Sequence, residues 1–221
     1  MRLIWALGLG AVGCAILIAL GVWQTQRLQW KTAILADIDA RIVDAPAALP
    51  KALDPIADRY LPVAMSGVLA EGELHVLTSI KGSGPGFRVI APFVTDDGRR
   101  ILLDRGFVPE VEKDTARDLG ALNVVGNVHW PDETDSFTPS PDIAGNFWFA
   151  RDVTTMAVAL ETEPLMVIAR ESDPPGPLPL PVTSDGVPNN HLEYAITWFS
   201  LAVVWAGMTA FLVWRIRWRH V

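Results

Sequence analysis

The sequence predicts two transmembrane α-helices that flank a mainly β domain of the α+β class, with about six mostly antiparallel strands and one or two short helices. Two runs without a charged side chain, residues 3–23 and 195–214, are each long enough to cross a hydrocarbon core of roughly 30 Å as a helix. Between them, apolar residues alternate with polar ones and are interrupted by turn residues, which is typical of strands. Because 50% of the 221 residues are hydrophobic and concentrate in these runs, a soluble cytosolic protein is excluded.

Charge is distributed unevenly along the chain and predicts its orientation. The segment 24–194 holds all 25 acidic residues and 14 of the 18 basic ones, so its net charge is −11. Such an acidic segment offers no basic surface, which excludes nucleic acid as a partner. The remaining bases flank the apolar runs: Arg2, Arg215, Arg217 and Arg219. By the positive-inside rule the C-terminus is cytoplasmic, the N-terminus is therefore cytoplasmic too, and the central domain lies in the periplasm.

The first membrane helix covers residues 1–23 and is expected to continue as a periplasmic helical extension over residues 24–45. Trp23, Arg27, Trp30 and Ile34 recur at helical spacing on one face. The apolar run is longer than the hydrophobic region of a signal peptide, so we expect no cleavage.

The β-rich domain is expected over residues 46–171. Alternating patterns predict strands near residues 61–65, 74–76, 87–91, 101–103, 122–130 and 165–169. Glycine-rich residues 81–86 indicate a turn, and the Asp-Gly step within residues 96–99 indicates a hairpin. Asp152 is a suitable N-cap for a short helix over residues 153–160.

The last third of the chain leads back to the membrane. Residues 172–188 contain six of the 17 prolines, which predicts an extended, semi-rigid tether over residues 172–190. The second membrane helix then covers residues 191–214, and a basic cytoplasmic tail covers residues 215–221.

Most kinds of catalytic chemistry lack the residues they need. Four histidines and one cysteine, Cys14, show none of the spacings of a closed zinc site or a copper–thiolate site. No nucleophile, base and orienting group can be named together, so a periplasmic enzyme is the least supported class. His75 and His129 lie in or at the end of strand patterns, and we expect both to be surface residues rather than ligands.

The ends of the two membrane helices hold the most distinctive side chains. His191, Tyr194, Trp198, Ala202 and Trp205 fall on one stripe of the second helix, and Trp23, Gln26, Arg27 and Trp30 lie at the same depth on the first. Small residues at four-residue spacing, Ala6, Gly10 and Cys14 on the first helix and Ala202, Ala206 and Ala210 on the second, favour close helix packing.

This stripe has two chemical interpretations. His191 could supply an axial ligand to haem iron, with aromatic faces stacked on the macrocycle and Arg27 paired with a propionate. Tryptophan and tyrosine also form the ordinary aromatic belt at a bilayer surface, beside a solvated histidine. From spacing alone the belt is the simpler interpretation, and both remain open.

Four ordered stretches span nearly the whole chain. They are LGVWQTQRLQWK at 20–31; GPGF at 84–87 with Pro92, DG at 97–98 and LLDRGFVP at 102–109; NFW at 146–148 with Asp152, Met156 and Ala157; and NHLEYAITWF at 190–199. Together they resemble the Surfeit-locus protein one family of cytochrome c oxidase assembly factors. The chain departs from the family where Asp104 replaces the commoner Asn and Phe107 the commoner Trp. Because no transit peptide precedes the first helix, we expect a bacterial member in the inner (cell) membrane.

The resemblance implies a non-enzymatic membrane chaperone that helps deliver haem a into oxidase subunit I. His191 is then the axial iron ligand, and the transiently bound haem a would contact Tyr194, Trp198, Trp23, Gln24 and Arg27. The expected partners are cytochrome c oxidase subunit I, haem a synthase and the lipid bilayer. The alternative is a cofactor-free scaffold that stabilises an oxidase assembly intermediate. At Arg105 and Gly106 we expect structural roles, an ion pair with a nearby carboxylate and a close backbone approach.

Overall fold

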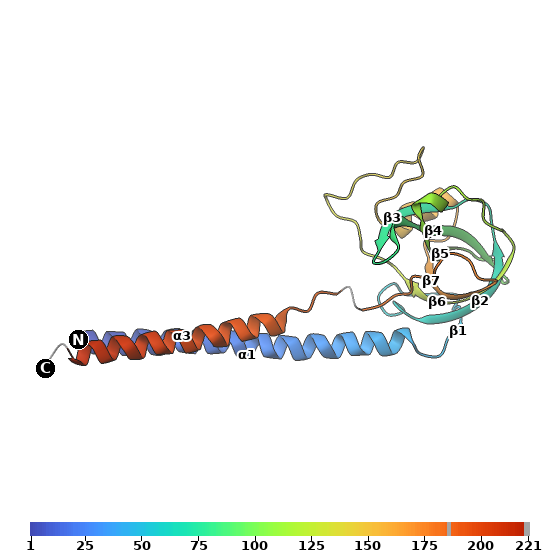
Figure 1. Ribbon diagram of the computed structural model, residues 1–221. Helices are drawn as coiled ribbons and strands as arrows, with labels where there is room; N and C mark the ends of the chain where they lie inside the picture. Colours follow the sequence, from blue (N-terminus) through green and yellow to red (C-terminus); the bar gives the residue numbers. More distant parts are fainter. Residues whose placement is uncertain (185–186, 219–221) are drawn as a thin grey trace. The chain divides into compact units, whose positions relative to one another are not determined.

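The computed structural model describes residues 1–184 and 187–218 of the chain (Figure 1). Its helices α1 (Arg2–Ile42) and α3 (His191–Trp218) are both long and apolar enough to cross a membrane. Two compact units are present: residues 1–37 together with the chain from residue 184 onward, and the domain Ile38–Thr183. The prediction of two apolar helices flanking a mainly β domain is confirmed.

Helix α1 is continuous over 41 residues. It contains no proline, and beyond Trp23 it is rich in Gln, Leu, Arg, Ala and Ile, most of which are good helix formers. The helix ends four residues before Pro46, which cannot continue it. The buried carbonyl of Ile42 accepts hydrogen bonds from Asn127 Nδ2 at 2.9 Å and from Arg170 Nη1 at 3.2 Å. These side chains satisfy a carbonyl that the last turn of a helix leaves free.

The domain is a curled sheet, seven-stranded within the residues that the structure describes (Figure 1). The strands are β1 (Ala47–Ala48), β2 (Pro62–Leu69), β3 (Leu74–Ile80), β4 (Gly84–Thr95), β5 (Arg100–Pro109), β6 (Ala121–His129) and β7 (Met166–Asp173). Their order is β1-β2-β6-β7-β5-β4-β3, and a second pairing of β2 with β4 closes five of them into a barrel. Only β1–β2 and β5–β7 are parallel. The expectation of mostly antiparallel strands is confirmed, and the short β1 is an additional strand.

The core has two layers because one side of the barrel is covered. Strand β2 alternates between buried and exposed residues, with Val63 and Met65 pointing into the barrel. Strand β5 is buried on both faces, since helix α2 (Val153–Leu160) packs on its outer side. Asp152 caps α2 as predicted: its carboxylate accepts from the backbone N–H groups of Thr154 and Thr155.

Turn chemistry sets the strand registers. The hairpin between β4 and β5 turns at Asp96–Arg99, where Gly98 has φ +85° and Thr95 N–H donates to the Arg99 carbonyl at 2.8 Å. The hairpin between β3 and β4 contains Gly82 at φ +95°. Both turns lie where the sequence indicates them. Strand β5 is followed by a single 3-10 turn, η1 (Glu110–Glu112).

Residues 174–180, the strap, lie against the barrel. Leu178 exchanges two backbone hydrogen bonds with Phe107 of β5, at 2.7 and 2.9 Å. A Cβ on Gly106, which has φ +109°, would overlap the Leu178 carbonyl and lie 2.8 Å from the Cα of Pro179. Gly106 therefore permits the close backbone approach expected of it. The compact domain reaches Thr183, so most of the proline-rich segment belongs to the domain.

Candidate functional site

The packed face of α3 follows a strict helical repeat. His191, Ala195, Trp198, Ala202 and Trp205 are the least exposed residues of its first four turns, and their spacing alternates between four and three. Ala195 and Ala202 are only 4% and 7% exposed. Tyr194, which the sequence placed on this stripe, is 54% exposed. It lies about 60° around the helix from His191, because three residues turn a helix by only about 300°.

Glycines on α1 receive large side chains of α3. A Cβ on Gly13 would collide with the indole ring of Trp205, and one on Gly21 would come within 2.7 Å of the Phe199 ring. The Trp205 indole N–H also donates to the Gly10 carbonyl at 3.2 Å. Close packing through small residues was expected, and Gly10 takes part in it. Ala206 and Ala210 are exposed, and they border a groove whose other wall includes Gly10 and Cys14.

A polar pair lies at the end of this packed face. Gln24 is 8% exposed, and its Oε1 lies 2.7 Å from His191 Nδ1. An amide oxygen can only accept, so the imidazole donates from Nδ1. In the neutral form of this ring, Nε2 is the nitrogen that carries the lone pair. This tautomer is the one that ligates a metal through Nε2 while a neighbour orients the ring.

The start of α3 is held from a second direction. The ammonium group of Lys31 donates to the carbonyl of Pro188, three residues before His191. Lys31 lies seven residues, or two turns, beyond Gln24 on the same face of α1. Gln24 and Lys31 together fix the first turn of α3 beside α1.

The remaining predicted site residues do not all meet at this pair. Trp198 shares the packed face of His191, about 10 Å further along α3. Trp23 is 54% exposed, and Arg27 lies over the Trp30 ring at 3.9 Å from its centroid, on other faces of α1. The predicted stripe of Trp23, Arg27 and Trp30 is therefore not the face that meets His191, which is the face of Gln24.

The domain contains a buried charged centre that the sequence did not reveal. Asp104 is fully buried, and its Oδ2 accepts from Arg88 at 2.6 Å and from Arg151 at 3.1 Å. Its Oδ1 accepts from the backbone N–H of Gly106 at 3.1 Å. Arg151 also pairs with Glu133; burial raises the pKa of Glu133, but this ion pair outweighs burial and holds that pKa below its usual range. Every charge in the centre has a partner, which indicates a structural role.

Of the two domain histidines, for which surface positions were expected, His75 is buried and His129 is half-buried. His75 is 4% exposed; its Nε2 donates to Glu73 and its Nδ1 accepts from the Asn146 amide. His129 stacks on Tyr60 at 5.1 Å, and its Nδ1 is buried without a hydrogen-bond partner. Among the described residues, no three His, Cys, Asp or Glu side chains form a group that could hold a metal ion.

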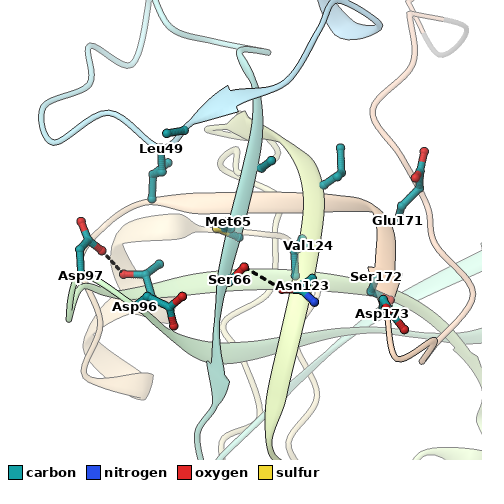
Figure 2. Close-up of a pocket in the computed structure, with 14 residues that line it drawn as sticks. Leu49, Met65, Ser66, Asp96, Asp97, Asn123, Val124, Glu171, Ser172 and Asp173 are labelled. Carbon is teal, nitrogen blue, oxygen red and sulfur yellow. Dashed lines mark hydrogen bonds between the residues drawn. The ribbon is translucent and has the colours of Figure 1, made fainter.

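A cavity of 580 Å³ lies over β2 and β6, and four of its polar side chains form two hydrogen-bonded pairs (Figure 2). The Ser66 hydroxyl donates to Asn123 at 2.7 Å, and the Thr95 hydroxyl donates to Asp97. Further carboxylates, Glu171 and Asp173, lie on the opposite side of the cavity from Asp97.

The fold and the polar pair define a class of protein: a two-helix membrane protein with a β-barrel domain and an oriented histidine between its helices. The SURF1 family profile matches residues 11–203. The chain is 35% identical over 213 residues to a SURF1-like protein of Monosiga brevicollis, covering 87% of this chain and 82% of that one. It is 30% identical over 200 residues to a SURF1-like protein of Rickettsia felis, covering 85% and 88%. It is 30% identical to Surfeit locus protein 1 of Rattus norvegicus over 208 residues, covering 82% and 67%. The chain belongs to the SURF1 family.

Proposed function

We propose that this protein is an assembly factor for cytochrome c oxidase that holds haem a at its helix pair and helps deliver it to subunit I. SURF1 proteins are known as cytochrome c oxidase assembly factors, and membership of that family supports the general role. The finer role rests on one observation, the hydrogen bond from His191 Nδ1 to Gln24 Oε1. It orients the ring, and in the neutral imidazole it leaves the lone pair on Nε2, which is the form of histidine that binds haem iron.

The surroundings of His191 suit a lipophilic cofactor. The imidazole is partly exposed at the head of an apolar helix, and Trp198 follows on the same face. Bound there, haem a would receive its axial ligand from His191. Tyr194, Trp23 and Arg27 are exposed on neighbouring faces of the two helices, where they would contact the macrocycle. Transfer within the bilayer avoids exposing apolar porphyrin surface to water, at ~25 cal/mol per Å².

The proposal includes a topology and partners. Arg215 and Arg217 lie in the last turn of α3. Basic residues at this end of the helix favour a cytoplasmic C-terminus, and therefore a periplasmic domain in a bacterial inner membrane. Subunit I would receive the haem a, and haem a synthase would supply it. A carrier of this kind catalyses no reaction.

The test is haem a binding by the purified full-length protein, produced in a strain that makes haem a. We expect the wild type to show a haem difference spectrum and His191→Phe to lose it. Gln24→Leu should bind about 10–100-fold more weakly, because the ring loses its orienting partner. Two matched controls should bind like the wild type: His129→Phe in the domain, and Gln26→Leu on the exposed side of α1.

The outcomes separate this role from the alternatives. Unchanged haem stoichiometry and Soret position in His191→Phe would show that His191 is not the ligand. If His191→Phe also restores full oxidase activity in a strain lacking the protein, haem delivery is wrong and a cofactor-free scaffold is the correct function.

A further inference from the structure

A second cavity of the β domain, of 490 Å³, lies between the last residues of β5 and the first residues of β6. Strand β7 pairs with β5 only from Leu102 to Asp104, so the following residues of β5 have no β7 partner. Strand β7 ends at Asp173, opposite Asn123 of β6. The gap between residues 105–109 and residues 121–122 is the cavity, and the strap crosses it.

The cavity has a fixed, largely apolar wall. Three strap prolines and Leu178 line it on one side, and Phe107 and Leu122 line it on others; the prolines are Pro174, Pro175 and Pro177. The strap is held by the two backbone hydrogen bonds between Leu178 and Phe107. Prolines have few conformations to lose, so this wall is ordered before any ligand arrives.

Arg105 is the unpaired cation of this cavity. Its side chain is partly buried, and none of the described residues hydrogen-bonds or ion-pairs with its guanidinium. Burial lowers the pKa of Arg105, and the positive charge of the neighbouring Arg117 lowers that pKa as well. The negative charge of Glu73 acts in the opposite direction but does not outweigh burial. The expected pairing of Arg105 with a carboxylate is therefore wrong. Each of four other domain arginines has a carboxylate partner: Arg88, Arg99, Arg117 and Arg151.

The guanidinium borders the cavity next to Gly176 of the strap, which has no side chain. The Arg105 Nη2 atom would lie 3.1 Å from a Cβ built on Gly176 of the strap, a contact that few Cβ atoms make. The five N–H donors of an arginine form a planar fork that matches a carboxylate. A partly desolvated fork without a partner is a preorganised anion site.

We propose that this cavity binds a monocarboxylate with an apolar body, its carboxylate on Arg105 and its body against the prolines and Phe107. Two exposed acids at the cavity, Glu112 and Asp118, oppose any ligand that carries several negative charges. They favour a single carboxylate over a phosphate dianion. The proposal does not depend on haem binding by the helices.

The test is equilibrium dialysis, which measures the binding of radiolabelled 3-phenylpropionate to the full-length protein in zwitterionic detergent. Detergent alone is the blank. We expect saturable binding of one ligand per chain. The neutral isostere 3-phenylpropanamide should bind at least tenfold more weakly, because it lacks the charge that Arg105 attracts. Inorganic phosphate should compete poorly.

Three variants locate the site. Arg105→Gln should weaken binding of 3-phenylpropionate at least tenfold, and Gly176→Val should weaken it similarly by filling the space beside the guanidinium. Lys51→Gln removes an exposed positive charge that does not line the cavity and should change the affinity less than twofold. Thermal unfolding of each variant shows whether it is folded.

A measurement on the wild type needs no variant. Phenylglyoxal modification of Arg105, read by peptide mass spectrometry, should be suppressed by 3-phenylpropionate and not by the amide. Equal binding of acid and amide, unaltered affinity in Arg105→Gln, or modification of Arg105 that the acid does not suppress would each overturn the proposal.

Discussion

Acidification should destabilise the domain through His129. Burial, together with the positive charges of Arg151 and Arg59, lowers the pKa of His129 from the ordinary value of 6.5 to about 4. Its Nδ1 has no hydrogen-bond partner within the described residues, so a proton there would be buried and unpaired beside arginines. Between pH 6.5 and 4 the unfolded chain binds this proton and the folded chain does not. Stability is therefore lost as the pH falls through this window.

The magnitude follows from the two pKa values. Between pH 7 and pH 5 the free energy of unfolding should fall by about 2 kcal/mol because of His129 alone. For a domain of this size that corresponds to a fall in Tm of roughly 4–8 °C. His129→Phe cannot take up the proton and keeps an aromatic ring against Tyr60.

The assay is thermal unfolding of the full-length wild type and of His129→Phe at pH 7 and pH 5, followed by tryptophan fluorescence. All other titrating groups are common to both proteins, so the difference between the two pH-dependent changes isolates His129. Between pH 7 and pH 5 we expect the Tm of the wild type to fall by roughly 4–8 °C more than the Tm of His129→Phe. An equal loss in both proteins would refute the burial of a neutral His129.

Two further substitutions should act through the stability of the domain. Gly106→Ala places a Cβ on the Leu178 carbonyl at a positive φ and should cost about 2–4 kcal/mol; normal membrane abundance by immunoblot with lost oxidase assembly would instead mark a contact surface. Asp104→Asn removes the charge between Arg88 and Arg151 and should cost about 3–5 kcal/mol, seen as a lower Tm; an unchanged Tm would mean that the arginines find other partners.

Local sequence signals predicted the elements that local physics determines. The hairpin at residues 96–99 and the helix after Asp152 were predicted at their observed positions, because a glycine at positive φ and a carboxylate cap each act within a few residues. The two apolar helices were also predicted from the sequence, because the thickness of a membrane sets the length of apolar run that a spanning helix needs.

Contacts between distant segments could not be predicted in this way. His75 looked like a surface residue beside Leu74, yet Asn146, 71 residues away, helps to cover it. The sequence predicted an extended, semi-rigid tether over residues 172–190, because prolines favour an extended backbone. Proline content does not show what the extended chain packs against, so the hydrogen bonds of the strap to Phe107 were not predicted.

For the helix pair, the sequence predicted which residues are distinctive, but the face of α1 that it assigned to the contact with His191 was wrong. Gly10 and Gln24 were named from the sequence, but their shared face with Gly13 and Gly21 was not recognised. These four residues share one face of α1, and three of them lack a side chain. A helix packs where its side chains are smallest, so the glycines were the better guide to the face that meets α3.

The hydrogen bond between His191 and Gln24 has a kinetic consequence. It assigns the imidazole proton to Nδ1 whether or not Nε2 is occupied, since the Gln24 oxygen can only accept. A ligand at Nε2 can then arrive and leave without a proton moving between the two ring nitrogens and without a rotation of the ring.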